Sequence, residues 1–117
     1  MSEPVDDCVF CKIIAGEIPA DVLARNEHAV SFKDLNPQAP FHALVVPLAH
    51  HTDAAASAAA DPSIVGHAVA LADEVARAAG NEHYRLVANT GRGAGQTVFH
   101  THFHVLAGSS GMTERLV

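Results

Sequence analysis

Three histidines alternate with other residues inside the short run from Phe99 to Ala107. Because successive side chains of an extended strand point to opposite faces, we expect His100, His102 and His104 on one face. Neighbouring members would lie roughly 6.5–7 Å apart at the backbone, close enough for two imidazoles to flank one phosphate or hold one metal ion. Imidazole is a nucleophile, a proton carrier and a metal ligand near neutral pH, so this row predicts an active-site strand rather than histidines scattered over a solvated face.

Two kinds of chemistry fit such a row. H-x-H pairs on strands bind zinc or iron through neutral imidazole. Alternatively, one imidazole attacks phosphorus, its second ring nitrogen donates the hydrogen bond that fixes its tautomer, and a neighbour handles the leaving-group proton. The glycine-rich run from Gly91 to Thr97 leads into the histidines, and its backbone N–H groups could approach phosphate oxygens closely. Such a run is also an ordinary hairpin connection, but its position beside the imidazoles favours a phosphate cradle.

Short helices and strands must position these residues. A short helix is expected from Cys8 to Ala15, and the runs Val22 to Ala24 and Val30 to Phe32 flank a polar turn, which predicts a hairpin. The apolar run from Ala43 to Val46, stopped by Pro47, predicts a strand covered on both faces. The remaining expected elements are a strand from Tyr84 to Ala88, a loop from Asn89 to Gln96 and a last strand from Thr97 to Leu106.

The clearest helix is expected between Asp61 and Gly80, because a capping side chain precedes Pro62 and glycine suits a left-handed end. The alanine-rich run from Ala54 to Ala60 before it also favours helix. We therefore predict an α+β fold, with an antiparallel sheet, one long helix and a short N-terminal helix. The long helix has one apolar stripe, formed by Ile64, Ala68, Leu71, Ala72, Val75 and Ala79.

Composition narrows the possible partners. With 117 residues, of which 49% are hydrophobic, the chain fits a single domain over residues 1–117. A formal charge of −6 argues against a protein that binds duplex nucleic acid, although a nucleotide-sized ligand can still be held by local donors. The acidic N-terminus lacks an apolar leader, and no apolar run reaches the ~20 residues of a membrane span, so we expect a cytoplasmic protein with no membrane partner.

The sequence from His100 to Leu106 resembles the H-x-H-x-H-apolar-apolar signature of the histidine triad (HIT) superfamily, and the chain looks most like the histidine triad nucleotide-binding (Hint) branch. This resemblance implies a HIT-like fold, a homodimer, and binding of purine nucleoside monophosphates such as AMP. It also implies a phosphoramidase, which hydrolyses phosphoramidate or acyl-phosphate bonds through a nucleotidyl-histidine intermediate without an organic cofactor. The similarity extends through Phe10 to Ile14, Glu17 to Ala20, Asp34 to Pro40, Val45 to Pro47 and Tyr84 to Asn89.

The resemblance also implies roles for individual residues. His102 matches the family nucleophile, and the carbonyl of His100 would hold its ring in the attacking tautomer. His104 and Thr97 match groups near the α-phosphate and the leaving group, and Asp34 would receive the ribose hydroxyls. The other implied contacts are Phe10 and Leu35 around the base and Asn89, Gly95 and Gln96 beside the phosphate. By their chemistry alone, the two apolar residues of this set fit a hydrophobic core equally well.

A structural zinc ion is expected at the two cysteines. Cys8 and Cys11 supply soft ligands at a tight spacing, and His50 aligns with a family histidine near the triad, so His100 could complete a Cys2His2 tetrahedron. His51 is the obvious rival of His50. The more distant galactose-1-phosphate uridylyltransferases, which this region resembles, share such a site beside their own histidine nucleophile. The alternative is a pair of free buried thiols.

The chain departs from the family pattern at three places. Thr97 stands where many members have serine, which keeps a hydroxyl, and Ala107 with Gly108 replaces the usual glycine pair. The tail from Ser109 to Val117 lacks the aromatic segment that helps some relatives to select substrates. Two other functions stay open: a diadenosine polyphosphate hydrolase of the fragile-histidine-triad type, which the short tail disfavours, and a non-catalytic nucleotide-binding regulatory protein.

Overall fold

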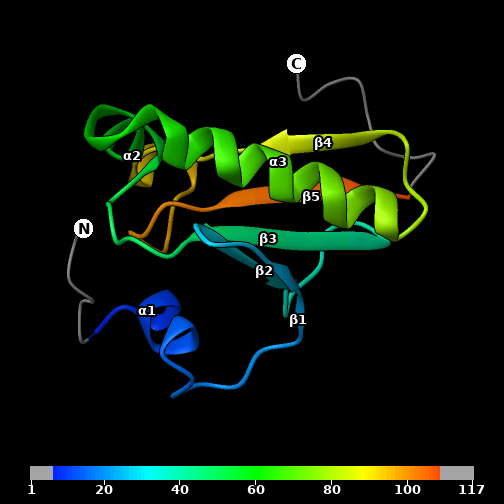
Figure 1. Cartoon of the computed structure of the whole chain (residues 1–117), viewed down its shortest axis with the longest axis horizontal. Coiled ribbons are helices and arrows are strands. Elements are labelled where there is room, and N and C mark those ends of the chain that lie inside the picture. The colour runs from blue at the N-terminus through cyan, green and yellow to red at the C-terminus, as the bar shows by residue number, and fades with distance from the viewer. Residues whose placement is uncertain (1–6, 109–117) are drawn as a thin grey trace.

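The computed structural model describes residues 7–108 as an α+β fold built on one five-stranded antiparallel sheet (Figure 1). The strand order is β1-β2-β3-β5-β4, so β3 and β5 form the centre. The tail that the sequence analysis singled out lies outside the described residues. No helix among residues 7–108 is long and apolar enough to cross a membrane. The elements are α1 (Val9–Ile14), β1 (Val22–Arg25), β2 (Ala29–Lys33), β3 (Phe41–Pro47), α2 (Ala54–Ala60), α3 (Pro62–Ala78), β4 (Tyr84–Val87) and β5 (Phe103–Ala107).

The two faces of the sheet are covered by different helices, α3 on one side and α1 on the other (Figure 1). On the central strands, Val45 and Val105 face α3 and are completely buried. Leu44 and Val46 point to the opposite face, where they pack with residues of α1. The prediction of a β3 strand covered on both faces is therefore confirmed, and the alternation of faces sends the even-numbered residues of β5 toward the α1 side.

Helix α3 has the ends that the sequence predicts. The Asp61 side chain caps the first turn by accepting from the Ser63 N–H, and Gly80 follows the last turn with a φ of 86°. The predicted stripe is buried at its centre, partly buried at Ile64 and exposed at Ala79. Helix α3 ends at Ala78, so Ala79 lies beyond the part of the helix that packs against the sheet. Its buried residues are Ala68, Leu71, Ala72, Val75 and Ala76.

The last strand begins later than predicted: β5 starts at Phe103 rather than at Thr97. The preceding segment pairs with a loop instead of a strand. The Thr101 N–H donates to the His51 carbonyl over 2.8 Å, and the Thr101 hydroxyl donates to the Asp53 carbonyl over 2.6 Å. His100 and His102 therefore lie on an extended segment that is anchored to the connection between β3 and α2.

Candidate active site

His102 has the tautomer that a nucleophile requires. Its Nδ1 lies 2.8 Å from the backbone carbonyl oxygen of His100, and since that oxygen can only accept, Nδ1 carries the proton. The lone pair is then on Nε2. Burial lowers the pKa of His102, which keeps the ring neutral, and the Phe10 ring packs edge-on with 5.0 Å between ring centroids. The site therefore holds an imidazole that is neutral, oriented and unprotonated at one nitrogen.

His104 lies next to His102, with 5.1 Å between their ring centroids. Burial, followed by the neighbouring histidines, lowers the pKa of His104 to about 4. One of those neighbours, His42, was missed by the sequence analysis. Its Nε2 lies 2.9 Å from His104 Nδ1 and 3.3 Å from a carboxylate oxygen of Asp34. His42 stands two residues before Leu44, so strand alternation could have placed it on the α1 face, but only the pairing of Leu44 with His104 brings it to the site.

A pocket of about 320 Å³ brings most of the predicted nucleotide contacts together. Its size suits a small-molecule ligand. Leu35 is 95% exposed at the pocket, so the alternative placement of this residue in the core is wrong. Phe10 is buried at 6% exposure and belongs to both the core and the pocket wall. The predicted site residues that line the pocket are Phe10, Asp34, Leu35, Thr97, His102 and His104.

The glycine-rich loop contributes less to this pocket than predicted. Its centre is a 3-10 turn from Arg92 to Ala94, and the N–H groups of Ala94, Gly95 and Gln96 all donate to carbonyls within the loop. The Gln96 side chain is buried and braces the loop, accepting from the Gly91 N–H and donating to two backbone carbonyls. These amides are therefore engaged inside the protein. Asn89, Gly95 and Gln96 are not among the residues that line the pocket.

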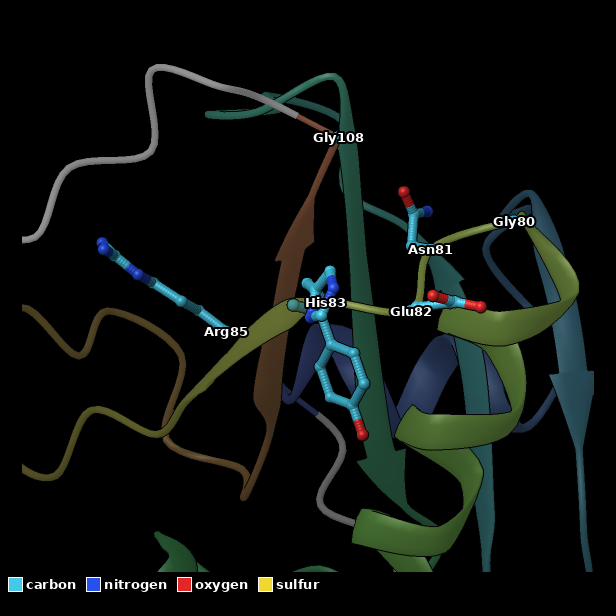
Figure 2. A pocket seen from close by; sticks show the side chains of 7 residues that line it. Gly80, Asn81, Glu82, His83, Arg85 and Gly108 are labelled. Carbon is cyan, nitrogen blue, oxygen red and sulfur yellow. The ribbon is translucent and has the colours of Figure 1, made fainter.

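A larger hollow, of about 630 Å³, lies at the start of β4 and is bordered by the polar residues Glu82, His83 and Arg85 (Figure 2). It contains none of the three histidines of the motif. The smaller hollow is the better candidate for a site of chemistry, because it combines apolar walls with His102 and His104.

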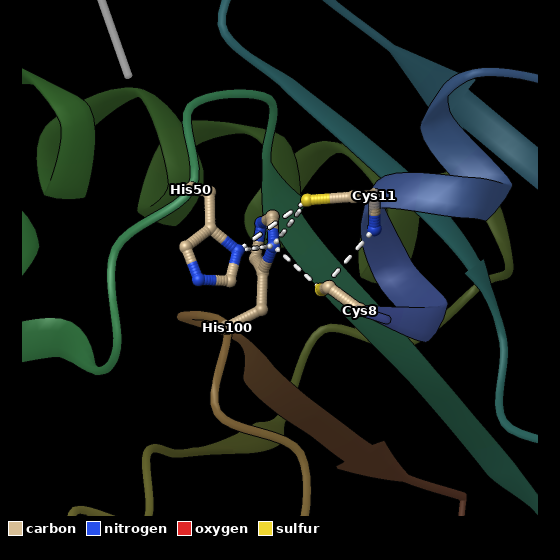
Figure 3. Close-up of side chains that lie close together, drawn as sticks. All are labelled: Cys8, Cys11, His50 and His100. Atoms are coloured by element: carbon tan, nitrogen blue, oxygen red, sulfur yellow. Dashed lines mark hydrogen bonds between the residues drawn. The ribbon is translucent and has the colours of Figure 1, made fainter. Parts of the chain in front are cut away.

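Beside the pocket, two cysteines and two histidines converge (Figure 3). The Nδ1 atoms of His50 and His100 are 3.1 Å apart, and the Cys11 sulfur lies 3.3 Å from the first and 3.6 Å from the second. Cys8 Sγ lies 3.4 Å from His100 Nδ1. Zinc with nitrogen and sulfur ligands at ~2.0–2.3 Å separates them by roughly 3.3–3.8 Å in a tetrahedron. The four distances, from 3.1 to 3.6 Å, are close to this range, and all four ligand atoms lie within 4.8 Å of one another, so the cluster could hold such an ion.

The backbone decides which histidine joins this cluster. The sequence left His50 and His51 as rivals, and the structure places His50 in the cluster, while the His51 carbonyl receives the Thr101 N–H. His100 is completely buried, and its Nε2 donates to the Pro47 carbonyl over 2.7 Å, which leaves Nδ1 as a ligand atom. Burial raises the pKa of the Cys8 thiol, so an ion would displace a proton there.

His100 therefore connects the two parts of the site. Its ring faces the cysteines, while its carbonyl accepts the hydrogen bond that orients His102. The prediction that three imidazoles share one face is thus refined. His102 and His104 border the pocket, and His100 is completely buried within the metal-binding cluster.

Known proteins resemble this chain in sequence and in fold. The family model described as HIT domain matches residues 15–111. Protein HitA of Neisseria gonorrhoeae is 40% identical over 103 residues, which span 87% of this chain and 96% of that protein. Among solved structures, a HIT family hydrolase from Clostridium thermocellum superposes with a TM-score of 0.89 at 37% identity, covering 94% of this chain and 97% of that one.

A histidine triad protein from Clostridium difficile has a TM-score of 0.87 at 36% identity, with coverage of 92% of this chain and 96% of that chain. The similarity extends over nearly the full length of each protein, as the sequence resemblance implied. Assignment to the narrower Hint branch stays a prediction. The chain belongs to the HIT domain family.

Proposed function

We propose that this protein is a nucleotide hydrolase. It cleaves the phosphoramidate or acyl-phosphate bond that joins a purine nucleoside monophosphate to a leaving group. The observation that carries the proposal is the hydrogen bond from His102 Nδ1 to the His100 carbonyl, because it leaves a lone pair on Nε2 of a residue that lines the pocket. The structural neighbour from Clostridium thermocellum, described as a HIT family hydrolase, supports hydrolysis as the type of reaction.

In the first step, the Nε2 lone pair of His102 forms a bond to the α-phosphorus. The bond from phosphorus to the leaving nitrogen or oxygen breaks, and the leaving group takes the electron pair while the ring keeps its Nδ1 proton. An amine leaving group also takes a proton from water, and the hydroxide this leaves is neutralised by the proton that the second step releases. Water then attacks the nucleotidyl-imidazole, loses a proton to solvent, and releases the nucleoside monophosphate and neutral His102. Phosphorylated imidazole is a good leaving group, so this second step regenerates the enzyme.

The surrounding residues have complementary roles in this proposal. The carboxylate of Asp34 accepts hydrogen bonds from the ribose hydroxyls, while Phe10 and Leu35 contact the base. His104 and the Thr97 hydroxyl donate to the phosphoryl group and the leaving group. Because the amides of Gly95 and Gln96 are used inside the loop, the side chains supply most of the phosphate contacts.

The decisive variant is His102→Asn, tested with an adenosine phosphoramidate and with a diadenosine polyphosphate. We expect turnover to fall at least about 10³-fold while AMP affinity stays within about threefold, since only the nucleophile is lost. Asp34→Ala should weaken AMP binding, but the reaction should still pass through the nucleotidyl-imidazole on His102. Preferred cleavage of the diadenosine substrate would indicate the fragile-histidine-triad type, and absence of turnover with tight AMP binding would indicate a regulatory protein. Near-wild-type hydrolysis by the His102 variant would contradict the mechanism.

We also propose that Cys8, Cys11, His50 and His100 hold a structural zinc ion. When bound, the ion would fix the His100 ring, and the protein would present the His100 carbonyl to His102 in a constant position. Protein purified without added metal should contain about one zinc per chain. A metal-free protein whose stability is unchanged when both cysteines are replaced by serine would refute this site. If chelation abolished activity without unfolding the protein and without disturbing the hydrogen bond from His102 to the His100 carbonyl, the alternative of a catalytic metal would replace the proposed nucleophile.

We propose, finally, that the protein is a homodimer. Strand β4 is an edge of the sheet, with backbone groups that can pair with a second chain. Val69 on α3 is 40% exposed among small residues of the same helix. Both features suit a symmetric contact. Sedimentation of the full chain at micromolar concentration should give a dimer, and a monomer alone would refute the proposal.

A further inference from the structure

A chain of hydrogen bonds runs from a backbone amide to the pocket through two histidines. The Gln38 N–H donates to His42 Nδ1 over 2.9 Å. His42 Nε2 lies 2.9 Å from His104 Nδ1. The His42 side chain is only 3% exposed, so no bulk water can replace these partners.

The backbone amide fixes the direction of this chain. An N–H can only donate, so His42 Nδ1 must be unprotonated and the proton of the neutral ring is on Nε2. That Nε2–H in turn donates to His104 Nδ1, which places the His104 proton on its own Nε2. Asp34, with a carboxylate oxygen 3.3 Å from His42 Nε2, is the second acceptor for the same proton.

We propose that His42 is a positioning residue that holds His104 in the Nε2–H tautomer, the form in which His104 can donate a hydrogen bond to a phosphoryl oxygen in the pocket. The proposal rests on the proposed function and deepens it, because it assigns the donor state of the group beside the nucleophile. The two neighbouring imidazoles then have opposite tautomers: His102 presents a lone pair and His104 presents an N–H. A neutral donor stabilises developing negative charge without competing for the electron pair that attacks phosphorus.

The same three side chains, Asp34, His42 and His104, are also close enough to hold a cation. The Gln38 amide argues against that use. A metal ion would need the lone pair of His42 Nε2, and the proton would then have to move to Nδ1, where it would face the Gln38 N–H. Two donors would oppose each other in a buried place, which costs the full desolvation of an unsatisfied group. The hydrogen-bonded arrangement is therefore favoured.

The tautomers can be measured in the wild-type protein, without substrate, by NMR correlation of the imidazole nitrogens with the ring carbon-bound protons. We expect the unprotonated nitrogen to be Nδ1 in both His42 and His104, and the reverse pattern in His102. A proton on Nδ1 of either His42 or His104 would overturn the proposal. This measurement does not depend on hydrolysis, so a protein with these tautomers and no turnover would refute the proposed function alone.

Two variants test the consequence for catalysis. His42→Leu removes the donor, while His42→Gln replaces it with an amide N–H near the position of Nε2. We expect kcat to fall roughly 10- to 100-fold in the leucine variant, with KM within about threefold, and the glutamine variant to recover most of the loss. The His104 ring should show mixed tautomers only in the leucine variant. His83→Leu, the same change at an exposed histidine, is the control and should leave kcat unchanged.

Three outcomes would overturn the proposal. The first is a folded leucine variant with wild-type kcat, and the second is a glutamine variant as defective as the leucine variant. The third is a second equivalent of zinc, beyond the one assigned to the cysteines, that binds the wild type but not the leucine variant, because this would identify a cation site. If His42→Leu does not fold, the wild-type tautomers and the kcat of the glutamine variant still test whether His42 positions His104.

Discussion

His104 should make the stability of this protein fall steeply in acid. Its side chain is 20% exposed and receives a hydrogen bond from His42, and burial is the main cause that lowers its pKa from 6.5 to about 4. Replacement by glutamine removes the titrating group but keeps a polar side chain of similar length. His104→Gln is therefore the perturbation that isolates this effect.

The sign and size follow from proton linkage. Between pH 6.5 and about 4, the unfolded chain binds a proton at His104 that the folded protein does not bind, so the free energy of unfolding decreases as the pH falls. Each pKa unit that separates the two states corresponds to about 1.4 kcal/mol, and the lowering to about 4 therefore gives about 3 kcal/mol. Above pH 6.5 the ring is neutral in both states and contributes no pH dependence.

Urea denaturation followed by circular dichroism at a series of pH values measures this quantity. From pH 7.5 down to pH values of about 4, wild-type protein should lose about 3 kcal/mol more than the His104→Gln variant, under identical metal content. His83→Gln, at an exposed position, should follow the wild-type curve. Parallel curves for wild type and the His104 variant would show that the buried ring is not the source of acid sensitivity.

Three further changes test the core beneath the sheet and the hydrogen bonds near the site. Leu71→Ala, at a side chain of α3 that is 1% exposed and packs against the sheet, should lower the free energy of unfolding by about 2–5 kcal/mol in the same denaturation assay. Thr101→Val removes the hydroxyl that bonds Ser57 and the Asp53 carbonyl, and should cost about 1–3 kcal/mol; a neutral result would show that water replaces these bonds. Gln96→Leu frees the loop that carries Thr97, so it should raise the free energy of activation, measured from kcat, by more than it lowers the free energy of unfolding. Equal changes in the two free energies would refute this.

Local periodicity was enough to predict much of the fold. The capping residue Asp61 and Gly80 define the long helix, and the apolar run from Ala43 to Val46 becomes a strand buried on both faces. The motif around His102 was enough to identify the family. The start of the last strand was predicted too early because of a longer-range contact: the segment before Phe103 bonds to the loop at His51 and Asp53, so the strand starts late.

The sequence by itself determined the elements, the family and the spacing of Cys8 and Cys11, because helix caps, strand alternation and short motifs act over a few residues. Only the tertiary structure decided that His50 rather than His51 joins the cysteines, and that His42 meets His104 across β3 and β5. These contacts depend on the register of β3 and β5 and on the path of the loop between β3 and α2. A shift of one residue in register would send every side chain of a strand to the opposite face, and no local pattern around His42 fixes its partner on β5.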